Sequence, residues 1–193
     1  MSVINLDGRS LVHVGQMGGI ADQATELRSN NGALGQFQDL FKGDLGDALT
    51  ALGQTQTSQG QIIYSAQDGG LRLQTHHLSA DGTLTLKGQV DLPTPEGSRD
   101  ATLDKVIDVT VNGQKMLVTV SGNGNFISTH LMSDTGWLGA GMVHVAARGA
   151  GYDMPSDIRT VTAGGHTFVV MAGSGSGSLT GFRLDAKGQL TTT

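Results

Sequence analysis

The chain has 193 residues, of which 12 are basic and 17 acidic, and its formal net charge is −5. This length is enough for one domain with its own core. The scattered basic residues argue against nucleic acid and anionic membranes as partners, because both attract concentrated positive charge. The absence of cysteine excludes disulfides and thiolate zinc sites. It fits a cytosolic protein as well as an exported bacterial one.

The N-terminal segment MSVINLDGRSLVHVG lacks the basic start and the apolar stretch of a cleaved signal peptide. No apolar run in the chain approaches the roughly 20 residues of a membrane helix. We therefore expect neither a cleavable leader here nor insertion into a membrane.

Two series of glycines recur along the chain with a period of about 52 residues. One series opens apolar runs and consists of Gly8, Gly60, Gly113 and Gly165. The other lies in polar turns and consists of Gly32, Gly82, Gly136 and Gly188. Each turn glycine is expected to adopt a positive φ and to close two antiparallel strands. Two markers with one period indicate a repeated unit.

The repeated unit reads as four antiparallel strands. The four units cover roughly residues 1–45, 46–95, 96–148 and 149–193. In the third unit we expect strands at Lys105–Val111, Lys115–Ser121, Phe126–Ser133 and Trp137–Val145. Units of this kind, repeated every 40 to 55 residues, are typical of β-propeller blades. The sequence thus predicts a single all-β propeller domain of about four blades. A β-sandwich is the alternative, but it does not require repetition in phase.

One segment departs from the strand pattern. Residues 38–53, QDLFKGDLGDALTALG, place Leu45, Ala48, Leu49 and Leu52 at helical spacing. Gly43 and Gly46 interrupt it, and each costs about 1 kcal/mol in a helix. A short helical turn between the first two blades is compatible with this pattern, and a long helix is not favoured.

Four blades nearly fill the chain, so the ring is either closed by these blades or is half of a larger ring. An open arc would expose apolar blade faces and strand edges, which soluble proteins avoid. Three solutions stay open: the arc closes on itself, it pairs with a second copy, or it belongs to a longer parent chain.

Two histidines occupy equivalent places in the repeat. His76 and His130 each lie six residues before a turn glycine, at the position that Phe182 takes in the last unit. Strand alternation puts them on the face that packs against a neighbouring blade. We interpret them as packed histidines rather than metal ligands, and we expect His77 to face solvent.

Acidic residues gather before the first strands of two units, in DATLDKVID (100–108) and YDMPSD (152–157). The first strand of a blade lines the central channel, so Asp104, Asp108 and Asp157 are candidate calcium ligands. The alternative is that these residues cap turns at loop–strand junctions. No nucleophile elbow or phosphate loop is present, so the sequence leans away from an enzyme.

Three segments carry a resemblance to known propellers: LRLQTHHLSADGTLTLKGQVDL, KMLVTVSGNGNFISTHLMSDTGWL and FVVMAGSGSGSLTGFRLDAKGQLT. They resemble the repeated units in propeller regions of secreted hemolysin-type (RTX) calcium-binding proteins of alphaproteobacteria, and more distantly lactonase-like propellers. The resemblance implies an extracellular or particle-surface location, with the cytoplasm as the alternative. The chain departs from the secreted group because the calcium-binding nonapeptides are absent. No position matches a lactonase ligand.

These observations give one leading hypothesis and two alternatives. The leading hypothesis is a non-enzymatic binding or structural propeller module on a bacterial cell or particle surface, whose loops meet a protein or glycan partner. The first alternative is a lactonase-like hydrolase with a divalent ion, such as calcium, in the channel. The second is an assembly subunit that completes a ring with another copy of itself.

Overall fold

The computed structural model describes residues 2–6, 9–14, 23–27, 49–67, 71–92, 101–145 and 154–193. The described residues form strands and turns and contain no helix. Accordingly, this part of the chain has no helix long and apolar enough to cross a membrane.

The strands form four separate antiparallel sheets, which we call sheets I to IV. Sheet I consists of β1 (Ser2–Leu6), β2 (Arg9–Val14) and β3 (Gln23–Leu27). Sheet II consists of β4 (Leu49–Thr57), β5 (Gly60–Gln67), β6 (Arg72–Leu78) and β7 (Leu84–Asp91). Sheet III consists of β8 (Lys105–Val111), β9 (Gln114–Ser121), β10 (Phe126–Met132) and β11 (Met142–Val145). Sheet IV consists of β12 (Pro155–Ala163), β13 (His166–Gly173), β14 (Ser178–Leu184) and β15 (Leu190–Thr192).

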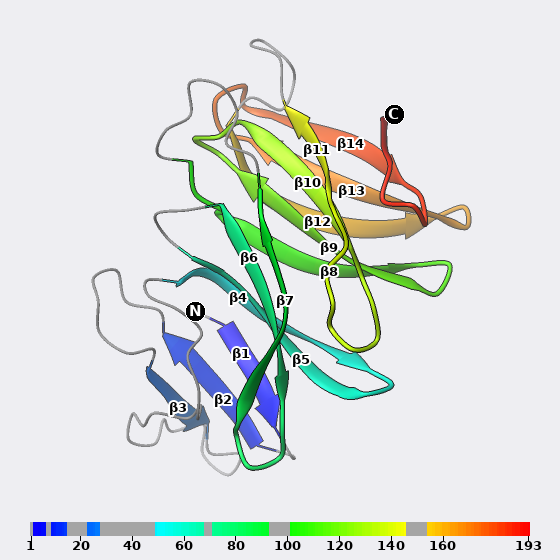
Figure 1. Cartoon of the computed structure of the whole chain (residues 1–193). Coiled ribbons are helices and arrows are strands. Elements are labelled where there is room, and N and C mark those ends of the chain that lie inside the picture. The colour runs from blue at the N-terminus through cyan, green and yellow to red at the C-terminus, as the bar shows by residue number, and fades with distance from the viewer. Residues whose placement is uncertain are drawn as a thin grey trace.

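The sheets follow one another in chain order, with sheets I and IV at opposite ends of the row (Figure 1). Within each sheet, neighbouring strands are also consecutive in sequence. The first strands contact each other in succession, β1 with β4, β4 with β8 and β8 with β12. We call these four the inner strands, and their succession matches the inner edge of propeller blades. The prediction of an all-β fold built from four-stranded antiparallel units is confirmed.

The predicted turn glycines have the expected backbone conformation. Gly82, Gly136 and Gly188 have φ values of 84°, 87° and 84° and connect the third and fourth strands of their sheets. This left-handed region penalises residues with a Cβ, which explains the glycine at each turn. Gly32, the fourth member of this series, lies outside the described residues.

The strand boundaries of the third unit agree with the prediction except at the fourth strand. β11 begins at Met142 instead of Trp137. Leu138 forms only an isolated bridge with Met132, and the chain leaves the ladder between Gly139 and Gly141. The helical pattern in residues 38–53 also fails at its end, because Leu49–Gly53 lie in β4 and pair with β5. Residues 38–48 lie outside the described part.

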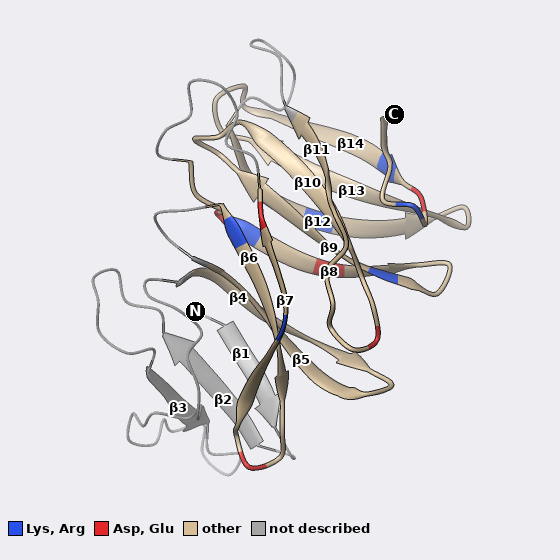
Figure 2. Cartoon of the chain, viewed as in Figure 1, with Lys and Arg blue, Asp and Glu red and all other residues tan. Residues whose placement is uncertain are grey.

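Two apolar cores lie between consecutive sheets. One core joins sheets II and III and contains Ile62, Tyr64, Leu73, Leu103, Val106, Leu117 and Phe126. The other joins sheets III and IV and contains Val109, Met116, Val118, Ile127, Ile158, Val169 and Phe182. Most residues of the described strands are neither basic nor acidic (Figure 2). The sheets therefore hold together through the hydrophobic contact of one face with the next.

Candidate functional site

Equivalent positions in sheets II, III and IV can be read from strand pairing. The hairpins between the first two strands close on Gly60, Gln114 and His166. Residues at the same distance after these three positions are equivalent in the second strands of the three sheets. Their pairing partners are then equivalent in the first and third strands. We define the forward face of a sheet as the face toward the next sheet in chain order.

The forward faces of sheets II and III are buried by the sheet that follows each of them. In sheet II the forward face includes Ile62, Tyr64, Ala66 and Leu73, which belong to the core shared with sheet III. In sheet III it includes Met116, Val118, Val120 and Ile127, which belong to the core shared with sheet IV. The equivalent residues of sheet IV are Phe168, Val170, Ala172 and Leu179.

The forward face of sheet IV is open. Leu179 is 75% exposed, whereas its equivalents Leu73 and Ile127 are fully buried. Val161 is 49% exposed, and its equivalent Val109 in β8 is 8% exposed. Leu179 and Val161 are thus exposed apolar side chains on a face that the next sheet buries in sheets II and III, and none of the described sheets covers this face of sheet IV.

Arg183 lies on the open face beside the apolar residues. It pairs with Phe168 and shares the face of its partner, and it is exposed. Arg159 pairs with Val170, but its guanidinium contacts Asp157, which also binds Lys105 of sheet III. The open face of sheet IV thus combines apolar residues with the positive charge of Arg183.

A repeated hydrogen bond joins sheet II to the turn of sheet III, and sheet III to the turn of sheet IV. The Thr75 hydroxyl of sheet II donates to the carbonyl of Gly136 in sheet III. The Thr129 hydroxyl of sheet III donates to the carbonyl of Gly188 in sheet IV at 2.6 Å. Both threonines are buried, at 0% and 2% exposure. A Cβ at Gly188 would lie 3.0 Å from Oγ1 of Thr129, so the glycine leaves room for this contact. We call this contact the threonine latch.

Sheet IV has no residue that could make this latch. The position equivalent to Thr75 and Thr129 is Gly181, which pairs with Val170 as Thr129 pairs with Val118. The Gly181 carbonyl instead accepts hydrogen bonds from the backbone and the hydroxyl of Thr193. The open face therefore differs from the buried forward faces in one polar contact as well as in exposure.

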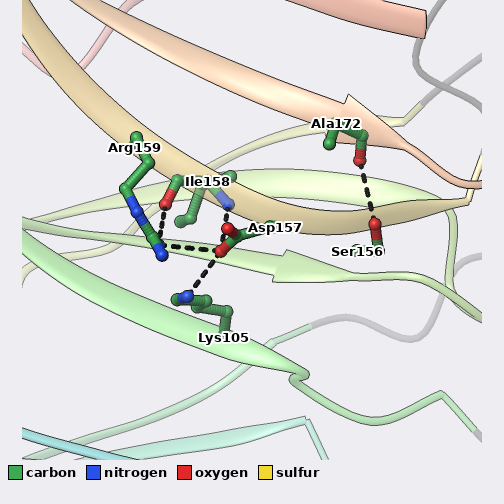
Figure 3. Close-up of polar contacts among 6 residues, drawn as sticks. All are labelled: Lys105, Ser156, Asp157, Ile158, Arg159 and Ala172. Carbon is green, nitrogen blue, oxygen red and sulfur yellow. Dashed lines mark hydrogen bonds and ion pairs between the residues drawn. The ribbon is translucent and has the colours of Figure 1, made fainter.

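An ion-pair cluster connects the inner strands of sheets III and IV (Figure 3). Lys105 of β8 and Arg159 of β12 both contact Oδ1 of Asp157, the latter at 2.8 Å. The Ile158 amide donates to the same oxygen at 3.0 Å. Although partial burial opposes it, the hydrogen bond and charge of Lys105, followed by Arg159, lower the pKa of Asp157. Asp157 is therefore held as a carboxylate that bridges two sheets.

The other two predicted calcium ligands have separate partners. Asp104 accepts a hydrogen bond from the Gly122 amide and one from the Thr102 hydroxyl, as a turn-capping residue does. Asp108 accepts a hydrogen bond from the Tyr64 hydroxyl at 3.1 Å, across sheets II and III. Burial, followed by the charge of Asp108, raises the pKa of Tyr64 well above its ordinary value.

The structure does not gather the three candidate ligands into one site. Across the described ranges, no three acidic or histidine side chains form a group that could hold a metal ion. Asp100 and Asp153, from the same two acidic segments, lie outside those ranges. The calcium site at Asp104, Asp108 and Asp157 stays a prediction.

Both histidines of the repeat are packed, as their spacing predicts. His76 is 3% exposed and His130 is 1% exposed. The Ser128 hydroxyl lies 3.0 Å from Nε2 of His130, and it also contacts the Thr119 hydroxyl at 2.6 Å. Burial lowers the pKa of His130 to about 4, against a smaller opposing effect of the Gly139 backbone. His77 is half-buried, with Nε2 at 3.2 Å from the Gln59 carbonyl, and is less solvent-exposed than expected.

The sequence analysis did not identify the open face or the threonine latch. The sequence did contain a signal for both, because Thr75 and Thr129 lie seven residues before their turn glycines and Gly181 replaces them in the last unit. Only the structure shows that these hydroxyls reach the next sheet.

No protein-family model and no curated protein match this chain. Similarity is found among solved structures. The periplasmic gluconolactonase of Pseudomonas aeruginosa superimposes with a TM-score of 0.72 and 17% identity, over 100% of this chain and 52% of that one. A putative 6-phosphogluconolactonase of Bacteroides fragilis gives 0.63 and 14%, over 96% and 52%. An exo-β-1,3-galactanase of Phanerochaete chrysosporium gives 0.59 and 12%, over 100% and 48%.

The fold is that of a β-propeller. At these identities the similarity concerns the fold alone, and this chain spans about half the length of each of the three structures. The distant resemblance to lactonase-like propellers is supported at the level of fold. None of these three structures is described as a hemolysin-type protein, and that resemblance stays a prediction.

Proposed function

We propose that the chain is a propeller-building binding module whose docking surface is the forward face of sheet IV. The partner is a protein that presents a further propeller sheet. The observation that carries this proposal is the exposure of Leu179, at 75%, where the equivalent residues of sheets II and III are fully buried. This reading refines the hypothesis of a non-enzymatic binding or structural module.

The free energy gained when the partner covers this face can be estimated from Leu179 alone. Complete burial of a leucine stabilises a protein by about 1.5–3 kcal/mol. With 75% of Leu179 exposed, roughly three quarters of that contribution is gained only when another surface covers it. Val161 and the half-buried Phe168 add to it on the same face.

An extended chain tests the proposal. A second copy of residues 149–193, added after Thr193, supplies a sheet whose back face already packs against sheet III in the natural chain. In the extended chain we expect Leu179→Asp to lower the free energy of unfolding by about 3 kcal/mol or more, because it buries an unpaired charge. In the natural chain, kept dilute enough to be monomeric, the same substitution should cost under about 1 kcal/mol.

The matched control is Leu86→Asp, because Leu86 is 51% exposed and lies on β7 of sheet II. It should have the same small effect in both chains. Equal effects of Leu179→Asp in the two chains would show that the forward face of sheet IV does not accept a propeller sheet.

A lactonase-like hydrolase is the second candidate, because two of the three similar structures carry a lactonase name. Its divalent ion would need ligands on or next to several inner strands, such as Asp157 in β12 and Asp104, which directly precedes β8. Calcium at a hundred times its Kd would stabilise the protein by about 2.7 kcal/mol. An unchanged melting temperature at millimolar calcium, together with no hydrolysis of a sugar lactone, would remove this candidate. A glycan partner and an extracellular location stay predictions.

A further inference from the structure

We infer that Asn112 is a modification site, at which the side-chain amide is lost through attack by the next backbone nitrogen. Asn112 and Gly113 form the two-residue turn between β8 and β9, where Val111 pairs with Gln114. The tip of this hairpin projects from the side of the molecule (Figure 1). The inference is independent of the proposed docking function, because the turn belongs to sheet III and not to the open face of sheet IV.

The reaction uses neighbouring atoms of the chain and water. The backbone nitrogen of Gly113 attacks Cγ of Asn112, and a new C–N bond forms. The side-chain nitrogen leaves as ammonia, with the proton of the attacking amide, and a cyclic succinimide results. Water then opens the ring at one of its two carbonyls, which leaves aspartate or isoaspartate at position 112. The step needs neither an oxidant nor a reductant.

The turn leaves both reacting groups accessible. Asn112 and Gly113 are exposed, and their φ values are 50° and 82°. A Cβ added at Gly113 would meet no atom within 4 Å, and glycine places no side chain beside the attacking nitrogen. Within the described part of the chain, neither the Asn112 side chain nor the Gly113 nitrogen makes a hydrogen bond. No contact therefore has to break before the nitrogen can approach the side-chain carbonyl.

Asn123 is also followed by a glycine, but its surroundings hold both reacting groups. Its Oδ1 accepts hydrogen bonds from the Thr102 amide at 3.0 Å and from the Ser121 hydroxyl at 3.2 Å. The nitrogen of Gly124 donates to the Ser121 hydroxyl at 3.0 Å, and Gly124 is buried. These hydrogen bonds have to open before the same attack can occur. Asn123 is therefore a matched control within the same chain.

Isoaspartate in this turn would weaken sheet III. Aspartate at position 112 can keep the left-handed conformation, which asparagine and aspartate tolerate better than most residues. Isoaspartate instead adds a methylene group to the backbone, so the two-residue turn no longer matches the pairing of Val111 with Gln114. β8 contributes Val106 to one core and Val109 to the other. A distorted β8–β9 hairpin therefore disturbs the packing on both faces of the sheet.

The test is to age the purified full chain at mildly alkaline pH and to map its peptides by mass spectrometry. Cleavage after Lys105 and Lys115 releases Asn112 in the peptide 106–115, whereas Asn123 lies in the peptide 116–148. We expect the amide-to-acid mass increase to accumulate at Asn112 at least about tenfold faster than at Asn123, a factor that corresponds to about 1.4 kcal/mol. Equal rates at the two residues in the folded chain overturn the inference.

The chain unfolded in guanidinium chloride shows whether the turn is the cause. Asn112 and Asn123 have the same following residue type, so their rates in the unfolded chain should be alike. If the unfolded chain shows the same rate difference as the folded chain, the turn does not select Asn112, and the inference is overturned.

A variant tests the effect on sheet III. Asn112→Gly removes the reacting amide and leaves two glycines, which a two-residue hairpin accepts. Ageing should lower the melting temperature of the natural chain in proportion to its isoaspartate content, while the melting temperature of the variant stays constant. If isoaspartate accumulates at position 112 without a fall in melting temperature, the expected weakening of sheet III is wrong.

Discussion

The fold should lose stability between neutral pH and about pH 4, because over this range His130 binds a proton only in the unfolded chain. The ring is 1% exposed, and burial lowers its pKa from 6.5 to about 4. The unfolded chain therefore binds a proton near pH 6.5, whereas the folded chain stays neutral until about pH 4. The histidine's contribution to stability is fully present above pH 6.5 and is lost progressively as the pH falls toward 4. The difference of about 2.5 pH units corresponds to roughly 3 kcal/mol.

The perturbation that isolates this effect is His130→Phe. Phenylalanine is the residue that sheet IV has at the equivalent position, where Phe182 is 3% exposed, so an aromatic ring of this kind is compatible with the architecture. Other groups also titrate over this range, so the quantity of interest is the difference between the natural chain and the variant.

The assay is urea unfolding at pH 7, 6, 5 and 4 at one protein concentration, with the free energy of unfolding taken at each pH. We expect the variant to gain about 3 kcal/mol relative to the natural chain between pH 7 and pH 4. His166→Gln, at an exposed histidine, serves as the control and should follow the natural chain. Parallel pH curves for His130→Phe and the natural chain would refute the reasoning, because His130 would then be protonated alike in both states.

Three further predictions concern contacts between the strands. Thr129→Val removes the hydroxyl that donates to a buried carbonyl and should lower the free energy of unfolding in urea by about 1–3 kcal/mol. Thr129→Ser keeps a hydroxyl and should retain most of the stability. Equal stabilities of the valine and serine variants would contradict the threonine latch. Gly53→Ala should be strongly destabilising, since a Cβ there would lie 2.4 Å from the Tyr64 ring, and adding Tyr64→Val should recover much of the loss. Asp157→Asn should cost under about 1 kcal/mol, because this ion pair is substantially exposed; a larger loss of unfolding free energy would indicate a stronger link between sheets III and IV.

The repeat was predictable from the sequence because local chemistry and tertiary structure demand the same residues. Gly82 and Gly136 are required by a backbone conformation that almost any other residue resists, so they mark their turns whatever surrounds them. His130 was placed correctly for a related reason, since strand alternation decides which face a residue takes.

The site was less predictable because it depends on what lies across an interface. Leu179 and Ile127 look alike in the sequence, yet one is 75% exposed and the other fully buried. Asp104 and Asp157 look like channel carboxylates, but a turn amide holds the first and two cations hold the second. Pairing of this kind follows from the relative placement of sheets, which no single segment encodes.

The threonine latch bears on how such a chain can grow. In the third unit the donor Thr129 and the acceptor Gly136 lie seven residues apart, and the hydroxyls of Thr75 and Thr129 each reach the turn carbonyl of the next unit. Duplication of one unit in the gene would thus create a complete polar contact at the new junction at once, without a compensating change elsewhere. Substitution of the threonine or of the turn glycine would weaken a contact with the adjacent blade rather than one within its own blade. The sequences of neighbouring units therefore constrain each other.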